Sequence, residues 1–164
     1  MVHLREGSGP GHLLPATFRL SALSNDCSAI CLRNAFFSKR GGAAFFQPAG
    51  FVRLRWSQSK VSLAEIQMLY EQTLSLLVTT GTHKILSVHG QRAPLSGAAQ
   101  QWITENWIPR ALRLPRLSHC AIVEGADPLH RLSTQSVVSA SPAGLIFRRF
   151  TASVEAEEWL SKLV

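Results

Sequence analysis

Short strand-like runs of apolar residues alternate with amphipathic helical patterns from residue 43 to the C-terminus. The strand-like runs are FVRLRW (51–56), HKILSV (83–88), HCAIVE (119–124) and LIFRRF (145–150). Strands that alternate with helices predict one open sheet carrying crossover helices. We therefore expect an α/β fold with a mixed four- or five-stranded sheet, an N-terminal β-hairpin and about four helices.

The hairpin is predicted at residues 43–56, where two β-rich runs flank the turn residues 47–50 (QPAG). Alternation in the second run places Val52, Leu54 and Trp56 on one face, which we expect to be buried.

Capping residues mark the starts of the first two long helices. Ser62 and Glu65 form an S-x-x-E capping box, and Gly81 is expected to end that helix. Ser96 is predicted as the N-cap of the next helix. Pro109 should kink that helix, because proline lacks the backbone N–H that an interior helical position uses.

The last two helices carry similar signals. Asp127-Pro128 predicts an N-cap followed by proline at the first helical position, and Ser153 is expected to cap the terminal helix. We expect Trp159 to anchor that terminal helix on the sheet. Helical spacing in the helix after Asp127 predicts the inward residues Leu129, Leu132 and Val137.

Residues 1–40 fall outside this alternating pattern. The segment 17–37 is predicted either as an extra hairpin or as part of a poorly ordered extension. In both interpretations residues 43–164 form the α/β domain, and we expect the sheet to form without residues 1–40.

Composition narrows the function. The chain has 164 residues and a formal net charge of +7, but its basic residues are scattered, which argues against a specific nucleic-acid site. Its longest apolar runs are only a few residues, whereas a membrane span needs about 20. The first residues lack the sustained apolar run of a secretion signal. We expect a cytoplasmic protein without a membrane span.

Metal and cofactor motifs are not evident. Cys27 and Cys31 have C-x3-C spacing with no second pair to complete a zinc site, and Cys120 stands alone. No phosphate-binding glycine motif occurs. Ser87, His89 and Asp127 offer a Ser/His/Asp set on paper, but no G-x-S-x-G elbow exposes the serine. We therefore expect no metal, no cofactor and no enzymatic activity.

Three segments carry a family resemblance: QQWITENWIPRAL, AIVEGADPLHRLSTQSVV and RRFTASVEAEEWL. Their ordered features are the Trp56 strand end, Trp102/Trp107/Pro109, Ala121–Val123, and Phe150 through Ala156 to Trp159-Leu160. Over residues 43–164 the chain resembles the SpoIIAA-like, STAS-type family of small bacterial proteins. That family is similar in fold to anti-sigma-factor antagonists and, more distantly, to lipid-binding CRAL-TRIO domains. Relatives often carry an acidic pair where this chain has Val88-His89-Gly90-Gln91.

The resemblance implies a regulatory or protein-interaction domain that binds an unidentified protein partner. In STAS regulators a serine at a helix N-terminus can be phosphorylated, and by position that serine is Ser96, followed by Gly97. Free N–H groups and the helix dipole favour a phosphate there, and Arg92 could add positive charge. Plain helix capping also explains Ser96.

A carrier of an apolar or lipid-like small molecule is the alternative function. Trp102, Trp107 and Ile103 lie on the Pro109-containing helix and could border a pocket between that helix and the sheet. Core packing also explains the tryptophans: Trp56, Trp102 and Trp159 fall on inferred core faces, and Trp107 lies nearer the kink.

Overall fold

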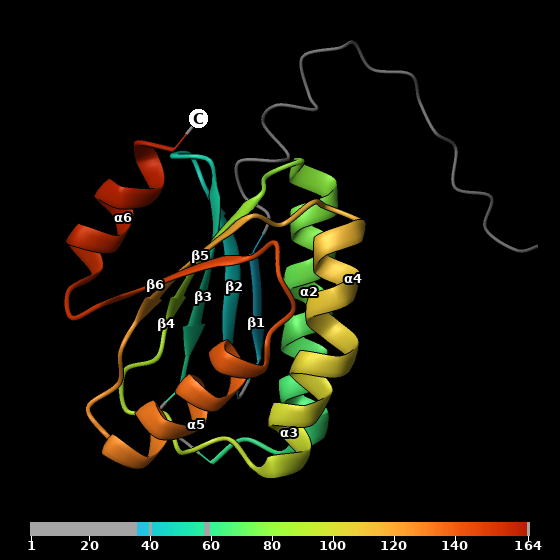
Figure 1. The fold of residues 1–164 in the computed structure, drawn as a ribbon. Coiled ribbons are helices and arrows are strands. Elements are labelled where there is room, and N and C mark those ends of the chain that lie inside the picture. The colour runs from blue at the N-terminus through green and yellow to red at the C-terminus, as the bar shows by residue number, and fades with distance from the viewer. Residues whose placement is uncertain (1–35, 40, 58–59, 164) are drawn as a thin grey trace, which may run out of the picture.

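The computed structural model of the protein describes residues 36–39, 41–57 and 60–163, and in these residues it contains one six-stranded sheet with helices on both faces (Figure 1). The strands are β1 (Phe36–Lys39), β2 (Gly42–Gln47), β3 (Phe51–Trp56), β4 (Lys84–Val88), β5 (His119–Val123) and β6 (Ile146–Phe150). The helices are α2 (Leu63–Thr80), α3 (Gly97–Trp102), the π-helical turn η1 (Ile103–Trp107), α4 (Ile108–Arg113), α5 (Pro128–Ala140) and α6 (Ser153–Ser161).

The strands are arranged in the sheet in chain order, β1 to β6. The pairs β1–β2 and β2–β3 are antiparallel, and the strands from β3 to β6 run parallel. The expected α/β class and mixed sheet are confirmed: five strands follow residue 41, and β1 is a sixth. The β2–β3 hairpin turns at the expected residues, where Gly50 has a positive φ of 84° and donates to the carbonyl of Gln47 at 2.9 Å.

The expectation that residues 1–40 contribute no strand to the sheet is wrong for Phe36–Lys39, which form β1. Strand β1 pairs with β2, with Phe36 opposite Phe45 and Lys39 opposite Gly42. The hairpin considered for 17–37 lies outside the described residues apart from Phe36 and Phe37. The single strand β1 therefore covers the edge of the hairpin that the sequence pattern identified.

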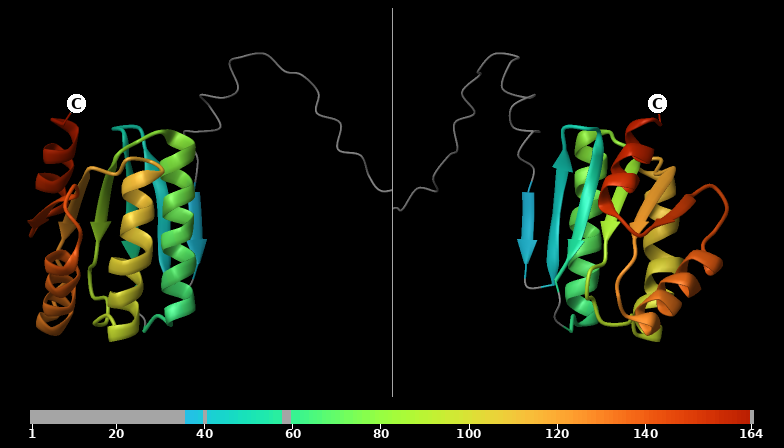
Figure 2. Two further views of the ribbon diagram at one scale, coloured as in Figure 1. Left: turned by 45° about the vertical axis from the view of Figure 1, so that its right-hand side comes forward. Right: turned by 90° about the vertical axis from the view of Figure 1, so that its left-hand side faces the viewer.

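Three helical segments cover one face of the sheet and α6 covers the other (Figure 2). The crossovers β3–β4, β4–β5 and β5–β6 all step in one direction, and because crossovers share one hand, their helices lie on the same face. The larger core lies under these helices and includes the buried β3 residues Val52, Leu54 and Trp56, as predicted. A smaller core lies under α6 and includes Phe51 and Leu160.

The predicted helix starts hold for α2, α3 and α5. Ser62 and Glu65 form the reciprocal capping box, and Gly81 ends α2 in the left-handed conformation. Asp127 accepts from the backbone N–H of Leu129 at 2.9 Å at the start of α5. Ser153 is the first residue of α6 rather than its cap; the N-cap position is Ala152, which has no side chain that could accept a hydrogen bond.

The helix from Gly97 to Arg113 runs through Pro109 by way of the π-helical turn η1. In this turn the N–H of Ile108 bonds the carbonyl of Ile103, five residues earlier. Proline lacks an N–H and its ring clashes with the carbonyl four residues before it in a regular α-helix. The wider turn just before Pro109 relieves this conflict, so the predicted distortion is present as a π-bulge.

Two predicted core positions are wrong. Leu129 and Leu132 of α5 are exposed, whereas Val137 is buried as predicted, together with His130, Ser133 and Thr134. The reason is that the polar face of α5 binds the loop after β4: the Ser133 hydroxyl oxygen accepts from the backbone N–H of Leu95 at 3.1 Å. Satisfied hydrogen bonds make it favourable to bury these small polar side chains.

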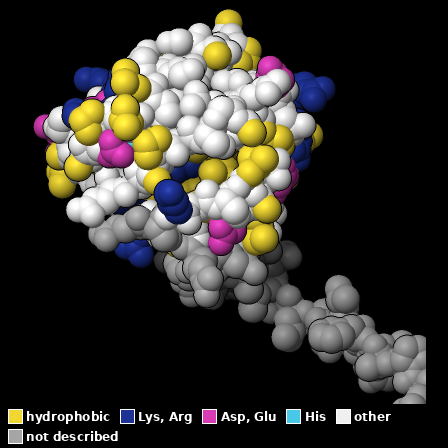
Figure 3. All heavy atoms as spheres, turned by 90° about the horizontal axis from the view of Figure 1, so that it is seen from below, with side chains coloured by type: hydrophobic (Ala, Val, Ile, Leu, Met, Phe, Trp, Pro, Cys, Tyr) yellow, Lys and Arg dark blue, Asp and Glu magenta, His cyan; other side chains and the backbone are white. Residues whose placement is uncertain are grey.

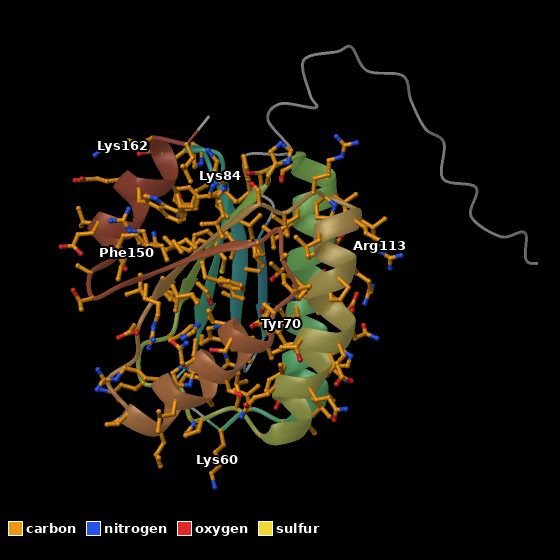
Figure 4. The ribbon with its side chains drawn as sticks, viewed as in Figure 1. Lys60, Tyr70, Lys84, Arg113, Phe150 and Lys162 are labelled. Carbon is orange, nitrogen blue, oxygen red and sulfur yellow. The ribbon has the colours of Figure 1, made fainter. Side chains whose placement is uncertain are left out.

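Trp159 is half-buried, whereas Ala156 and Leu160 of α6 are completely buried, and Leu160 is the larger of the two. Lys84 of β4 also binds this helix, donating to the carbonyls of Leu160 at 3.2 Å and Leu163 at 2.9 Å, where a cation complements the helix dipole (Figure 4). Leu160 therefore replaces Trp159 as the expected anchor of α6.

We expect Leu160→Ala to lower the free energy of unfolding by about 2–3 kcal/mol, near the low end for a buried leucine because a terminal helix can shift to close the gap. Trp159→Ala should cost less, about 1–2 kcal/mol, since part of its ring is already in water. Urea unfolding of the two variants tests the order. A larger loss for Trp159→Ala would mean that the helix is held by its aromatic contacts with Phe150 and His119.

Candidate functional site

The sequence-predicted site residues Arg92, Ser96 and Gly97 lie at the carboxyl ends of the parallel strands, in the loop after β4 and at the start of α3. The loops that follow the neighbouring parallel strands meet at this edge of the sheet. The loop from β4 is held by α5: His130 contacts the carbonyl of Ala93 at 3.2 Å. These contacts place Ser96 at the open edge.

Ser96 is the N-cap residue that the sequence predicts. Its hydroxyl oxygen accepts from the backbone N–H of Ala99 at 3.2 Å, and the residue is exposed. Gly97, the first residue of α3, is exposed as well. Gly97 and Ala98 of this first turn are thus exposed, Ala99 is buried, and the helix continues through η1 and α4 to Arg113.

Arg92 differs from the surface charge that the sequence suggested. It is 2% exposed, and its guanidinium carbon lies 3.4 Å from the centre of the Trp56 ring. The reason is the tight turn after β4, in which the backbone N–H of Arg92 bonds the carbonyl of His89 at 3.1 Å. This turn brings the side chain back over the end of β3.

The charge of Arg92 has no anionic partner among the described residues. Burial lowers its pKa to about 10, while the neighbouring Tyr70 partly opposes that shift. Burial raises the pKa of Tyr70, so the phenol is neutral at pH 7 and the guanidinium is charged. The Nη2 atom of Arg92 is buried and has no hydrogen-bond partner in the described part of the chain. A buried donor without a partner is costly, which makes this atom a candidate ligand contact.

Beside Arg92, a chain of hydrogen bonds runs from β3 to α5. The atoms Ser87 Oγ and His89 Nε2 are 3.0 Å apart, and His89 Nδ1 and His130 Nε2 are 2.8 Å apart. His130 Nδ1 ends the chain on the carbonyl of Ala93, and Trp56 Nε1 begins it by donating to Ser87 Oγ at 3.3 Å. His89 and His130 are both buried.

The Ala93 carbonyl at the end of this chain of hydrogen bonds determines which nitrogen of each histidine carries the proton. A carbonyl only accepts, so neutral His130 carries its proton on Nδ1 and accepts from His89 at Nε2. His89 then carries its proton on Nδ1 and accepts from the Ser87 hydroxyl. Burial and then the charge of Arg92 lower the pKa of each histidine, which keeps both neutral at pH 7.

A cavity of about 50 Å³ lies between the sheet, the α3–α4 helix and α5. Ile103 and Trp107, two of the three pocket residues that the sequence suggested, line it, and so does Arg92. Trp102 is not among the lining residues; it is half-buried, with its ring centre 6.3 Å from that of Tyr70. Trp102 packs against the core as inferred but is only partly buried, whereas Trp107, which was placed nearer the kink, is fully part of the core. The cavity is therefore smaller than a lipid-like ligand requires, and most of its wall is apolar.

Arg92 also lines a second hollow of about 230 Å³, together with Ser96 and the exposed Lys60. Figure 3 views this end of the molecule and shows Lys and Arg side chains next to hydrophobic ones around a depression. Lys60 projects from the same end in Figure 4. Positive charge, an exposed helix N-terminus and a buried guanidinium therefore meet at one site that suits an anion.

Other chemistry is less well supported at this edge. The described residues contain no group of three or more His, Cys, Asp or Glu side chains that could hold a metal ion. Cys120 is a free thiol whose pKa burial raises to about 12, and Cys27 and Cys31 lie outside the described residues. Asp127 caps α5 and is not part of the hydrogen-bonded chain of Ser87 and His89. Among the described helices, none has both the length and the apolar content needed to cross a bilayer.

Sequence reasoning missed Trp56, Tyr70 and His130 as site residues. His130 follows Asp127-Pro128 by two positions, so its helix was evident, but the exposed leucines on either side of it pointed to the wrong inward face. Neither Trp56 nor Tyr70 belongs to a local motif: Trp56 was assigned to the core, and Tyr70 was not singled out. Comparison of the chain with protein-family models, curated proteins and solved structures finds no significant match.

Proposed function

We propose that the protein is a non-enzymatic regulatory or protein-interaction domain of STAS type, which binds its partner through the Ser96 edge. The observation that carries this proposal is the exposed N-cap Ser96 next to a hollow lined by Lys60 and the buried Arg92. A phosphate on Ser96 would meet the N–H groups of the first helical turn and the charge of Lys60. Phosphorylation would thus change the charge of the contact surface without unfolding the helix.

The burial of the Ser87 and His89 chain supports the non-enzymatic part of the proposal. Ser87 is 5% exposed, and the cavity that it borders is about 50 Å³. A substrate carbonyl must come within about 3 Å of a nucleophile for an acyl transfer. The walls leave little room for a substrate to do so.

Ser96→Asp tests the switch. Aspartate is a good N-cap, so the fold should be retained, and a change in binding will report the added charge rather than lost capping. We expect the recovery of at least one partner by quantitative crosslinking capture from the native cell to change about fivefold or more. Ser96→Ala should bind as the unmodified protein does and lose about 1 kcal/mol of stability with the cap.

Ser139→Asp is the matched control, because Ser139 is an exposed serine in the last turn of α5. This variant should recover every partner to the same extent as the unmodified protein does. Mass spectrometry of the protein isolated from its own cells should find phosphate on Ser96. If Ser96→Asp and Ser139→Asp capture the same partners to the same extent, the Ser96 switch is rejected.

A small-molecule carrier is the second candidate function, and the unpartnered Nη2 of Arg92 beside an apolar cavity favours it. A cavity of about 50 Å³ restricts such a ligand to a small molecule, well below lipid size.

A further inference from the structure

We propose that the cavity between the sheet and the α3–α4 helix binds a small monocarboxylate, with the carboxylate on Arg92 and a short aliphatic part in the cavity. This inference rests on the second candidate function, for which it names the ligand class, and does not depend on Ser96. It rests on the buried cation, the apolar wall and the size of the cavity.

The charge of Arg92 is the first argument. The described residues that line the cavity include no Asp or Glu, and the nearest partner, Tyr70, is neutral at pH 7. One face of the guanidinium lies against Trp56, and Nη2 is buried without a hydrogen-bond partner among the described residues. A carboxylate binds to that edge in the geometry that guanidinium groups favour, and it neutralises a buried charge.

The wall of the cavity is the second argument, because it selects what is attached to the carboxylate. Leu54, Ile85, Ile108 and Val137 contribute apolar surface, and the Ser87 hydroxyl is already hydrogen-bonded to His89. A second ionised group would find no oppositely charged partner among the described residues of this wall. A monoanion with an aliphatic part therefore fits better than phosphate, which carries more charge and more acceptor oxygens.

Size is the third argument. Apolar cavities of about 150 Å³ hold benzene, and the volume here is about one third of that. This space suits the two aliphatic carbons of propionate. Because Arg92 lines both the cavity and the hollow near Lys60, the carboxylate would lie between them.

The test is a two-dimensional NMR titration of the full chain with sodium formate, acetate, propionate and hexanoate at pH 7.5, with sodium chloride holding the ionic strength constant. We expect saturable shifts in the indole N–H signals of two tryptophans. Trp56 contacts Arg92, and Trp107 lines the cavity. The signal of Trp159, on the opposite face of the sheet, should not move. Affinity should rise about fourfold for each methylene up to propionate and fall for hexanoate.

Arg92→Met should weaken propionate binding about tenfold or more, because it removes the only cation in the wall. Arg113→Met is the matched control: Arg113 is exposed on the outer side of α4 (Figure 4), and this variant should bind as the wild type does. Val137→Ile narrows the cavity while keeping Arg92, so it should weaken propionate binding and leave formate binding unchanged.

Several outcomes would overturn the proposal. They are the absence of saturable shifts with any carboxylate, equal affinity in Arg92→Met, or phosphate binding more tightly than propionate. If Arg92→Met does not fold, the series of carboxylates and the Val137→Ile variant still distinguish binding in the cavity from binding at the surface. A surface site would show neither the highest affinity for propionate nor an effect of the Val137→Ile substitution.

Discussion

Trp107→Ala is expected to lower the free energy of unfolding by about 3–5 kcal/mol, the range for truncating a buried tryptophan. Trp107 is 3% exposed, and its indole N–H donates to the carbonyl of Tyr70 at 2.8 Å. Its ring centre is 4.8 Å from that of Tyr70, so the side chain joins η1 to α2. Loss of the ring would enlarge the cavity beside it and remove the contact between these two helices.

Urea unfolding measures this loss, and two variants serve as controls. Trp107→Phe keeps most of the apolar contact but lacks the indole N–H, so we expect a smaller cost, near 1 kcal/mol for the hydrogen bond together with some lost packing. Trp102→Ala, at a half-buried position, should cost about 1–2 kcal/mol. Equal losses at 102 and 107 would contradict the assignment of Trp107 to the core.

Acid is expected to destabilise the protein through His89 and His130. Burial lowers the pKa of both below 6.5 in the folded state, whereas the unfolded chain binds protons with ordinary affinity. Below about pH 6.5 the unfolded state therefore holds more protons, and stability falls as pH falls. Each histidine that stays neutral in the fold contributes up to about 1.4 kcal/mol per pH unit.

Urea unfolding between pH 7.5 and 5 measures this effect, with an expected combined loss of up to about 4 kcal/mol at pH 5. Arg92 contributes to it, since its charge also lowers both histidine pKa values. His89→Gln should remove about half of the pH dependence. His119, whose pKa burial also lowers, lies near α6 and would leave a residual slope. A wild-type protein as stable at pH 5 as at pH 7.5 would show that the histidines accept protons within the fold.

The two proposed sites lie at the same edge of the sheet but use different residues. The interaction surface uses the exposed Ser96, Gly97 and Lys60, whereas the carboxylate site uses the interior side of Arg92. Because Arg92 borders both hollows, a ligand bound inside would change the charge that an incoming partner meets. Measuring partner capture with and without propionate would show whether the two sites are coupled.

Local chemistry accounts for the parts of the fold that were predictable. The Ser62–Glu65 capping box, the Ser96 and Asp127 caps and the turn at 47–50 all depend on residues within a few positions of one another. The alternation of strands and helices followed from side-chain periodicity, which likewise needs no distant partner. This information sufficed for the α/β class and for the position of Ser96 at a helix N-terminus.

The remaining features depend on partners that are far apart in the chain. Arg92 is buried because the Trp56 ring lies beneath it, and α5 turns its polar face inward because His89 and the loop at 93–95 supply hydrogen-bond partners. By hydropathy alone, Leu129 and Leu132 are better candidates for burial than His130. A polar group becomes favourable in a core only when its partners are in place, and only the tertiary structure brings those partners together.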